Sequence, residues 1–196
     1  AAGARRNIVV TGFGGEVVRA AIGDSVEYVE QREQLGTGHA VLQTKDLLAG
    51  EHGTIMVLCG DTPLLTAELL ARFHEEHVNA GAKATVLTAI MPNAKGYGRI
   101  VRRESGEVLK IVEHKDASPE EREIHEVNAG IYCFDAQALF SALAKVTNDN
   151  AQGEYYLPDV LSILRDAGEK IWAVVADNYE STLGINSRSQ LAVAER

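Results

Sequence analysis

The sequence has few of the features that mark secreted, membrane-embedded or nucleic-acid-binding proteins. It contains two cysteines and no apolar run of about eighteen residues, so neither a disulfide framework nor a transmembrane helix is predicted. No basic start followed by an apolar middle indicates a signal peptide. Acidic residues outnumber basic ones, 28 to 19, and no block of Lys or Arg offsets the net charge of −9. This charge balance argues against binding of nucleic acid through its phosphates.

The two cysteines, Cys59 and Cys133, both lie in apolar, strand-like runs. We therefore expect buried, small hydrophobic side chains in a reducing compartment rather than a disulfide or a metal pair. With 196 residues, 45% of them hydrophobic, the chain is long enough for one domain with a sizeable core. An acidic protein that handles phosphorylated ligands would need metal ions or a few well-placed cations.

Short apolar runs alternate with amphipathic stretches along most of the chain. This alternation predicts a Rossmann-like α/β/α sandwich of three layers with a mostly parallel mixed sheet. The expected strands are 7–12, 26–30, 55–58, 84–90, 96–101, 108–112, 127–134 and 171–175. The expected helices are 17–22, 40–48, 66–80, 136–145 and 155–167, with short ones starting at the caps Ser118 and Ser187. On the 66–80 helix, the inner face is predicted to carry Leu69, Leu70, Phe73 and Val78.

The stretch 55–65 is the centre of the pattern. The apolar run 55–58 predicts a buried strand of a parallel sheet, and Gly60 and Asp61 follow directly before Pro63 prevents further pairing. Ligands bind at the carboxyl ends of such strands. Asp61 therefore has two interpretations: it caps a turn or the next helix, or it is a ligand for a hard cation such as Mg²⁺.

Glycine-rich segments form the next candidates. The segment 12–15 lacks the spacing of a dinucleotide-binding fingerprint and predicts a turn into a helix. The segment 34–40 places glycines on both sides of Thr37 before an amphipathic stretch. Such a loop suits a ligand that approaches free backbone N–H groups, although the same residues also serve as an ordinary helix cap.

Two polar segments and one asparagine could have either a structural or a functional role. The run 113–116 after a strand is typical of a solvated loop. Asn128 near the start of a strand is either a structural hydrogen bonder or a group that binds a sugar hydroxyl. The segment 148–154 is a polar loop. No arrangement of Ser, His and Asp or of Cys and His indicates a catalytic nucleophile.

Taken together, these motifs resemble those of one family, the bifunctional N-acetylglucosamine-1-phosphate uridylyltransferases / glucosamine-1-phosphate acetyltransferases, in their uridylyltransferase (pyrophosphorylase) domain. The resemblance covers nearly all of the chain and rests on the segments 34–40, 59–65, 96–101, 111–116, 127–130, 148–158 and 184–186. Glucose-1-phosphate uridylyl- and thymidylyltransferases usually lack the motifs of 113–116 and 150–156. The implied fold is that of nucleotide-diphospho-sugar transferases.

The resemblance implies a role for each matching residue. Asp61 and Asn186 would be the catalytic pair and the two protein ligands of a Mg²⁺ cofactor. Gln31, Gly36 and Thr37 would hold the uracil base, and Gly60 would also contact substrate. The N-acetylglucosamine would contact Gly98, Glu113, Asn128, Glu154 and Tyr156. We expect the sugar-side and base-side residues to line opposite ends of one cleft, with Asp61 between them.

The implied reaction transfers a uridylyl group from UTP to N-acetylglucosamine 1-phosphate and releases pyrophosphate. It would supply cell-wall precursors in the cytoplasm, with small-molecule substrates and no nucleic acid or membrane partner. His39 and His114 are not expected to act as general bases, because the attacking phosphate is already ionised. The alternatives are another sugar-1-phosphate nucleotidyltransferase, using glucose 1-phosphate with UTP or dTTP, or a sugar-nucleotide binding fragment without turnover. An NAD(P)-dependent oxidoreductase is disfavoured by the glycine pattern.

The chain departs from the family pattern at its start. Members begin with a strand and a glycine-rich loop whose Arg and Lys hold the triphosphate, and residues 1–7 do not match it. We therefore interpret 1–196 as one nucleotidyltransferase domain that is incomplete at its N-terminus. The carboxy-terminal acetyltransferase β-helix, through which members are expected to form homo-oligomers, is also not in the sequence. These 196 residues alone are expected to be poorly stable and inactive.

Overall fold

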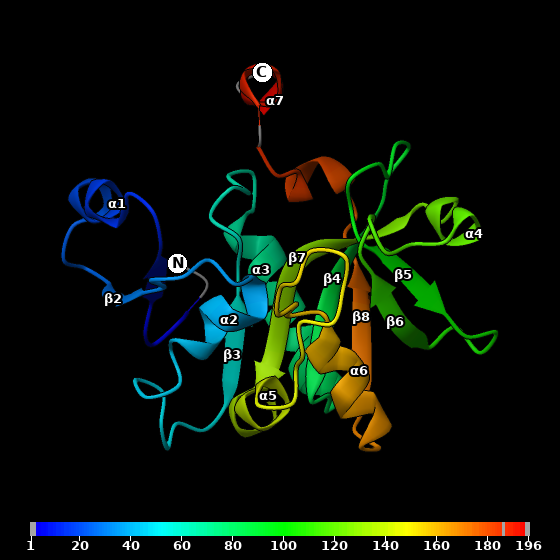
Figure 1. Ribbon diagram of the computed structural model, residues 1–196, viewed down its shortest axis with the longest axis horizontal. Coiled ribbons are helices and arrows are strands. Elements are labelled where there is room, and N and C mark those ends of the chain that lie inside the picture. The colour runs from blue at the N-terminus through cyan, green and yellow to red at the C-terminus, as the bar shows by residue number, and fades with distance from the viewer. Residues whose placement is uncertain (1–2, 186, 195–196) are drawn as a thin grey trace.

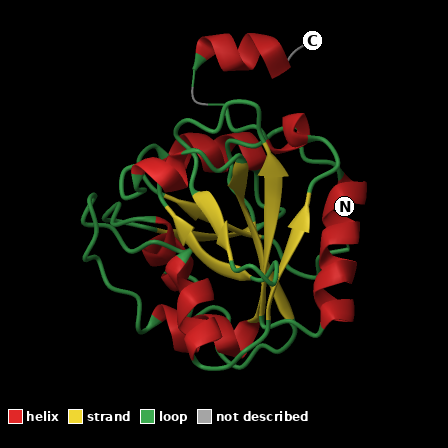
Figure 2. Cartoon of the chain, turned by 90° about the vertical axis from the view of Figure 1, so that its right-hand side faces the viewer, coloured by secondary structure: helices red, strands yellow, loops and turns green. Residues whose placement is uncertain are grey.

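The chain forms a six-stranded mixed sheet with helices on both faces, and a separate two-stranded sheet near the N-terminus (Figures 1 and 2). The structure is a computed structural model that describes residues 3–185 and 187–194. Its strands are β1 (Ile8–Thr11), β2 (Glu27–Glu30), β3 (Thr54–Val57), β4 (Ala84–Ile90), β5 (Arg99–Arg102), β6 (Val108–Val112), β7 (Glu126–Asp135) and β8 (Ile171–Val175). Its α-helices are α1 (Gly15–Ile22), α2 (Thr37–Leu42), α3 (Ala67–Ala80), α4 (Pro119–Arg122), α5 (Ala136–Leu143), α6 (Asp159–Asp166) and α7 (Arg188–Ala194), and a 3₁₀ turn spans Tyr179–Thr182.

The long strand β7 organises the larger sheet. One edge of β7 pairs with β4, and β3 and β5 pair with different parts of it, in the strand order β6-β5-β7-β4-β8 with β3 beside β7. Strands β3, β4, β5 and β8 run in one direction, and β6 and β7 run in the other. Most strands of the larger sheet thus share one direction, and the predicted mixed sheet is confirmed. The hydrogen-bonded neighbours are mostly antiparallel, because β7 lies between strands of the opposite direction, so the predicted mostly parallel pairing is wrong.

Two apolar cores make the fold a three-layer sandwich. On one face, α2, α5 and α6 pack against the sheet around Phe134, Leu139 and Val160. On the other face, α3 packs through Phe73 against Leu87 and other strand residues. Figures 1 and 2 show these helices on opposite sides of the strands. The predicted layer arrangement is therefore confirmed.

The N-terminal unit stands apart from the main sheet. Strands β1 and β2 pair in parallel and are connected by α1. Arg6 links this unit to the rest of the chain, since its guanidinium forms ion pairs with Glu27 at 2.7 Å and with Glu51 at 2.9 Å. No helix within the described residues is long and apolar enough to cross a membrane.

Two helices differ from the sequence predictions because of long-range hydrogen bonds. Helix α2 begins at Thr37, before the predicted start, and turns follow from Gln43 onward. Helix α6 begins only at Asp159, because the backbone of Tyr155 is already paired with Leu35 and Gly38. An amphipathic pattern does not reveal such partners, so these boundaries were wrong.

Two predicted burial patterns also differ. On α3, Val78 is 56% exposed and His77 is buried instead, where its Nδ1 atom lies 2.7 Å from the Thr85 hydroxyl. Strand β3 is only partly buried, and its one partner among the described strands is the antiparallel β7, so the predicted buried parallel strand is wrong. Of the two free cysteines, Cys133 is fully buried and Cys59 is partly buried.

Candidate functional site

The sugar-side candidates meet at an irregularity in β7. The pairing register between β4 and β7 shifts after Leu87, so that two residues of β7, Ala129 and Gly130, have no partner there. The Asn128 side chain bridges this bulge: its Oδ1 accepts from the Gly130 N–H at 2.9 Å, and its Nδ2 donates to the Tyr132 hydroxyl at 2.6 Å. Bulges of this kind re-aim side chains and are common next to active sites. The orientation of the Asn128 amide is thus fixed in advance of any ligand.

Gly98 and Glu113 lie directly beside Asn128. The Asn128 N–H donates to the Gly98 carbonyl at 2.9 Å. A Cβ atom on Gly98 would lie only 3.2 Å from Oε1 of Glu113, so no larger residue fits without movement. Sequence reasoning favoured a solvated loop for 113–116; Lys115 and Asp116 are indeed exposed, but Glu113 is partly buried. The three sugar-side candidates therefore adjoin one another.

The surroundings of Glu113 are acidic. Burial raises the pKa of its carboxyl, and the charges of Asp116, Asp159 and Glu154 raise it further. Burial raises the pKa of the Tyr156 hydroxyl, as do the charges of Asp116, Glu113 and Glu154, and this hydroxyl accepts from the Gln152 amide at 2.9 Å. Glu154 and Tyr156 thus lie within electrostatic reach of Glu113. A neutral hydroxyl donor, rather than an anion, suits such a group.

Two residues of this region were missed by sequence reasoning. Tyr132 binds the Asn128 amide, and Asp159 at the start of α6 has its pKa raised by burial and by Asp116. Tyr132 lies in an apolar strand and Asp159 in a predicted helix, so neither carried a signal in the sequence. Their roles follow from tertiary contacts alone.

The base-side candidates form a compact hydrogen-bonded loop. The Gln31 amide is buried and donates to the Gly36 carbonyl at 3.1 Å, and its Nε2 lies 3.0 Å from Nδ1 of His39. Gly36 has a φ of +105°, and a Cβ atom there would lie 2.7 Å from the Tyr155 carbonyl. The Thr37 hydroxyl accepts from the Leu157 N–H at 3.0 Å.

This loop therefore lies against the segment that contains Glu154 and Tyr156. Two more backbone hydrogen bonds, each of 2.8 Å, run from Gly38 to Tyr155 and from Tyr155 to Leu35. Base-side and sugar-side candidates are joined into one structure, although more than a hundred positions separate them in the sequence.

Asp61 lies in the turn that follows β3 and is exposed. Its carbonyl accepts from the Ile185 N–H at 2.8 Å, which brings the segment 184–185 next to it. Its carboxylate has no hydrogen-bond or ion-pair partner in the described part of the chain, and Thr66, not Asp61, caps α3. The neighbouring Cys59 thiol donates to the Gly130 carbonyl at 3.3 Å, and its pKa is raised by burial and by the charge of Asp61. Asp61 thus lies close to the bulge of Ala129 and Gly130 that Asn128 bridges.

Of the two predicted metal ligands, the structure describes only Asp61. Asn186 lies outside the described residues, so its distance from Asp61 is not tested. No group of three or more His, Cys, Asp or Glu side chains within 3–185 and 187–194 could hold a metal ion. An accessible carboxylate without a protein partner nevertheless fits the hard-oxygen preference of Mg²⁺, which takes only one or two protein ligands. Gly60 is exposed, and a Cβ atom there would meet no neighbour.

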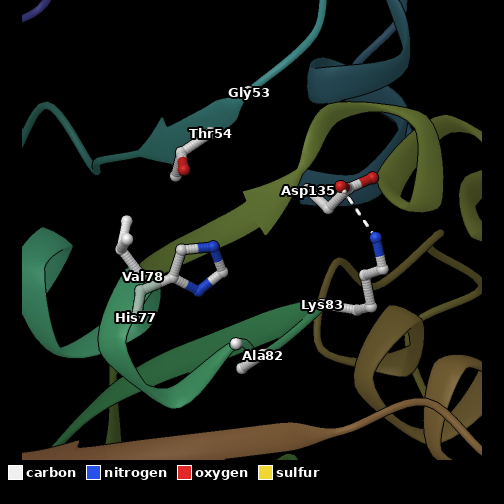
Figure 3. A pocket seen from close by; sticks show the side chains of 8 residues that line it. Gly53, Thr54, His77, Val78, Ala82, Lys83 and Asp135 are labelled. Atoms are coloured by element: carbon white, nitrogen blue, oxygen red, sulfur yellow. Dashed lines mark hydrogen bonds and ion pairs between the residues drawn. The ribbon is translucent and has the colours of Figure 1, made fainter.

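A cavity at the opposite end of the sheet contains none of these candidates. It has a volume of about 240 Å³ and lies at the starts of β3 and β4 (Figure 3). Lys83 and Asp135 form an ion pair of 2.9 Å across it, and His77 lies at its wall. These polar groups already have partners within the chain. The cavity is therefore not the candidate site.

The comparison with family models places the chain in a known group. The nucleotidyl transferase model matches residues 6–180. The chain belongs to the nucleotidyl transferase family. The match spans the base loop, Asp61 and all of the sugar-side candidates, and it ends before Asn186.

Curated members of the family give a closer match. The chain is 54% identical to the bifunctional protein GlmU of Oceanobacillus iheyensis over 189 residues, and 53% identical to that of Bacillus subtilis over the same length. Each alignment covers 96% of the chain. The protein of Geobacillus thermodenitrificans is 54% identical over 99% of the chain. The chain spans about 42% of the length of these relatives.

A solved structure supports the fold of this nucleotidyl transferase. The crystal structure of a UDP-glucose pyrophosphorylase complexed with UDP-glucose matches 93% of the chain and 77% of its own, with a TM-score of 0.71 and 16% sequence identity. At this identity the match shows the nucleotide-diphospho-sugar transferase fold alone.

Proposed function

We propose that the protein transfers a uridylyl group from UTP to N-acetylglucosamine 1-phosphate, which gives UDP-N-acetylglucosamine and pyrophosphate. Identity of 53–54% to bifunctional GlmU proteins over almost the whole chain supports this choice. The structural observation that carries it is the joining of the Thr37 loop to the segment 154–157, beside Glu113. A base site and a sugar site built as one unit suit a substrate that has both parts.

In this proposal, Gln31, Gly36 and Thr37 hold the uracil. The hydrogen bond between the Gln31 amide and the Gly36 carbonyl holds both groups in place. The loop therefore loses little conformational freedom when the base binds. The positive φ of Gly36 and its close packing on Tyr155 allow no side chain, which leaves its backbone accessible. Gly60 would contact substrate next to Asp61.

The sugar-side residues would bind the N-acetylglucosamine. Glu113 is partly buried, so that its carboxylate is a poorly hydrated acceptor for a sugar hydroxyl. Asn128 has one amide N–H left after its bond to Tyr132 and would donate it to the sugar. Gly98 would present its backbone, and Glu154 and Tyr156 would close the pocket wall.

Asp61 and Asn186 would hold a Mg²⁺ ion. When bound, this ion would neutralise part of the charge on the phosphates. The chain's own task is positioning, since the attacking phosphate oxygen is already ionised and no protein nucleophile is required. His39 lies among the amides of Gln31 and Gln43, in contacts that suit an ordering role rather than proton transfer.

Two alternatives make different predictions for the same assay. One is a transferase for glucose 1-phosphate with UTP or dTTP, and the other is a sugar-nucleotide binding protein without turnover. We place the reaction in the cytoplasm, as a supply of activated amino sugar for cell-wall precursors. Neither nucleic acid nor a membrane is a partner in it.

The test is pyrophosphate release by the protein at its full natural length, with UTP and N-acetylglucosamine 1-phosphate and with and without Mg²⁺. Release is expected only with Mg²⁺ present, and faster than with glucose 1-phosphate or with dTTP. Asp61→Asn should lower kcat/KM by about 10²–10³, as for other losses of preorganised charge at a reacting group. Asp46→Asn, an exposed change of the same kind away from the site, is the matched control. Preference for glucose 1-phosphate, or binding of UDP-N-acetylglucosamine without turnover, would favour one of the alternatives.

A further inference from the structure

A second cavity, of about 250 Å³, lies beside the start of β5 and the end of α4. Its charged and titratable lining residues are Lys95, Arg99, His114, Arg122, Glu123 and His125. Three of these side chains are cationic at neutral pH and one is anionic. The whole protein has a net charge of −9, so the positive charge of this cavity is opposite in sign to that of the protein.

Arg99 is a buried cation at the wall of this cavity. Its exposure is 2%, and its guanidinium donates to the carbonyls of Tyr97 and Arg122. It forms no ion pair with any carboxylate of the described residues. Burial lowers its pKa, the charge of Arg122 lowers it further, and the nearby charge of Glu123 partly offsets both effects. A buried charge of this kind is costly unless an opposite charge compensates it.

His114 adds a second unsatisfied group to the same wall. Its Nδ1 atom is buried and has no hydrogen-bond partner, which among the described side chains is otherwise true only of one Arg165 nitrogen. Burial lowers the His114 pKa, as do the charges of Arg99, Arg122 and Lys95. Buried polar atoms are nearly always hydrogen-bonded, so this unpaired nitrogen is consistent with a hydrogen-bond partner from a bound ligand.

The cavity is distinct from the candidate transferase site. Arg99 and His114 line it, whereas their sequence neighbours Gly98 and Glu113 adjoin Asn128. Neighbouring residues of an extended segment point to opposite faces, which accounts for this division.

We propose that this cavity binds a small tetrahedral oxyanion of the phosphate type. Arg122 and Lys95 provide exposed cationic side chains with no ion pair within the described part of the chain, and Arg99 provides a buried charge. The ring of His114 donates or accepts a hydrogen bond according to the proton it carries. Charge-assisted hydrogen bonds to several cations are the usual way in which proteins hold phosphate.

The test is calorimetric titration of the protein with inorganic phosphate, in a buffer free of phosphate and sulfate, and then with pyrophosphate. Arg122→Gln and Lys95→Gln should each weaken phosphate binding by roughly 10-fold, the scale for one charge-assisted hydrogen bond. His114→Phe, which keeps the ring but removes its nitrogens, should weaken binding as well. Arg103→Gln is the matched control, since this exposed residue pairs with Glu107 outside the cavity. Tighter binding of pyrophosphate than of phosphate would identify a diphosphate as the better occupant.

The titration is repeated with saturating UDP-N-acetylglucosamine, and phosphate affinity is expected to stay within about two-fold. Three results would overturn the proposal: no phosphate binding at millimolar concentration, equal affinities in the Arg122→Gln and Arg103→Gln variants, or complete competition by the nucleotide sugar. The exposed Arg122 side chain keeps the test decisive even where the His114 variant fails to fold. Since none of these readouts requires turnover, failure of the transferase assay leaves the test valid.

Discussion

The Thr37 hydroxyl accepts a hydrogen bond of 3.0 Å from the backbone N–H of Leu157, 120 positions further along the chain. This bond joins the first residue of α2 to the segment that leads into α6. Leu157 is buried, so its N–H depends on the Thr37 hydroxyl as its hydrogen-bond partner. One side chain thus connects the predicted base loop with the wall of the predicted sugar pocket.

Replacing Thr37 by Val should therefore affect both folding and binding. The substitution keeps the shape of the side chain but leaves a buried donor unpaired, which costs about 1–3 kcal/mol of unfolding free energy. Urea denaturation measures this cost, and titration with UDP-N-acetylglucosamine should show weaker binding. Thr37→Ser retains the oxygen and serves as the control. Equal stability of the Val and Ser variants would show that the hydrogen bond contributes nothing.

Replacing Gly36 by Ala tests the packing of the same loop. The new Cβ atom would lie 2.7 Å from the Tyr155 carbonyl, in addition to the strain of a φ of +105°. Gly153→Ala is the matched control, because Gly153 also has a positive φ but open space around it. The Gly36 variant should lose about 1–3 kcal/mol more stability than the control, the usual cost of overpacking. Thermal or urea unfolding of both variants decides the point.

Helix α3 offers a test of the corrected core. Phe73 is fully buried, and Phe73→Ala should cost about 3–5 kcal/mol of unfolding free energy. Val78 was predicted on the same inner face but is 56% exposed, so that Val78→Ala should change stability by about 0.5 kcal/mol or less. Urea denaturation of the two variants distinguishes the faces. A large loss for Val78→Ala would restore the original prediction.

Local sequence signals were sufficient for the parts of the fold that depend on local chemistry. The strands β4, β6 and β8 have the predicted bounds. The cap Thr66 accepts from the Leu69 N–H, and the capping box of Ser118 and Glu121 is formed. These features depend on residues within a few positions of one another, where periodicity and side-chain chemistry decide the outcome.

The misplaced elements depend on distant partners. The Tyr155 backbone is not helical because it pairs with the loop around Gly36, and no pattern near Tyr155 indicates that loop. Similarly, the contact of Tyr132 with Asn128 exists because a bulge inserts Ala129 and Gly130 between paired residues. Motifs could therefore nominate the candidate residues, whereas the way in which they are held follows only from tertiary structure.

Glu113 offers the sharpest test, because its environment opposes the charge that the proposed function requires. Burial and the charges of Asp116, Asp159 and Glu154 raise the pKa of its carboxyl in the folded protein above the ordinary value of 4.5. The folded chain thus binds this proton more tightly than the unfolded chain does. The Glu113 carboxyl therefore stabilises the fold at pH values below its ordinary pKa. This contribution is lost as the pH rises through its raised pKa in the folded protein.

The substitution Glu113→Gln removes this penalty while keeping the size of the side chain. The variant should be more stable than the parent at pH 7, and the advantage should disappear near pH 4, where the parent carboxyl is protonated. Binding of UDP-N-acetylglucosamine should nevertheless weaken by about 1–3 kcal/mol, because a charged acceptor is replaced by a neutral amide. Glu75→Gln, an exposed change of the same charge on α3, should alter neither quantity. Urea denaturation at both pH values and calorimetric titration measure the two effects. A Glu113→Gln variant that is less stable at pH 7, or that binds the nucleotide sugar unchanged, would remove Glu113 from the proposed site.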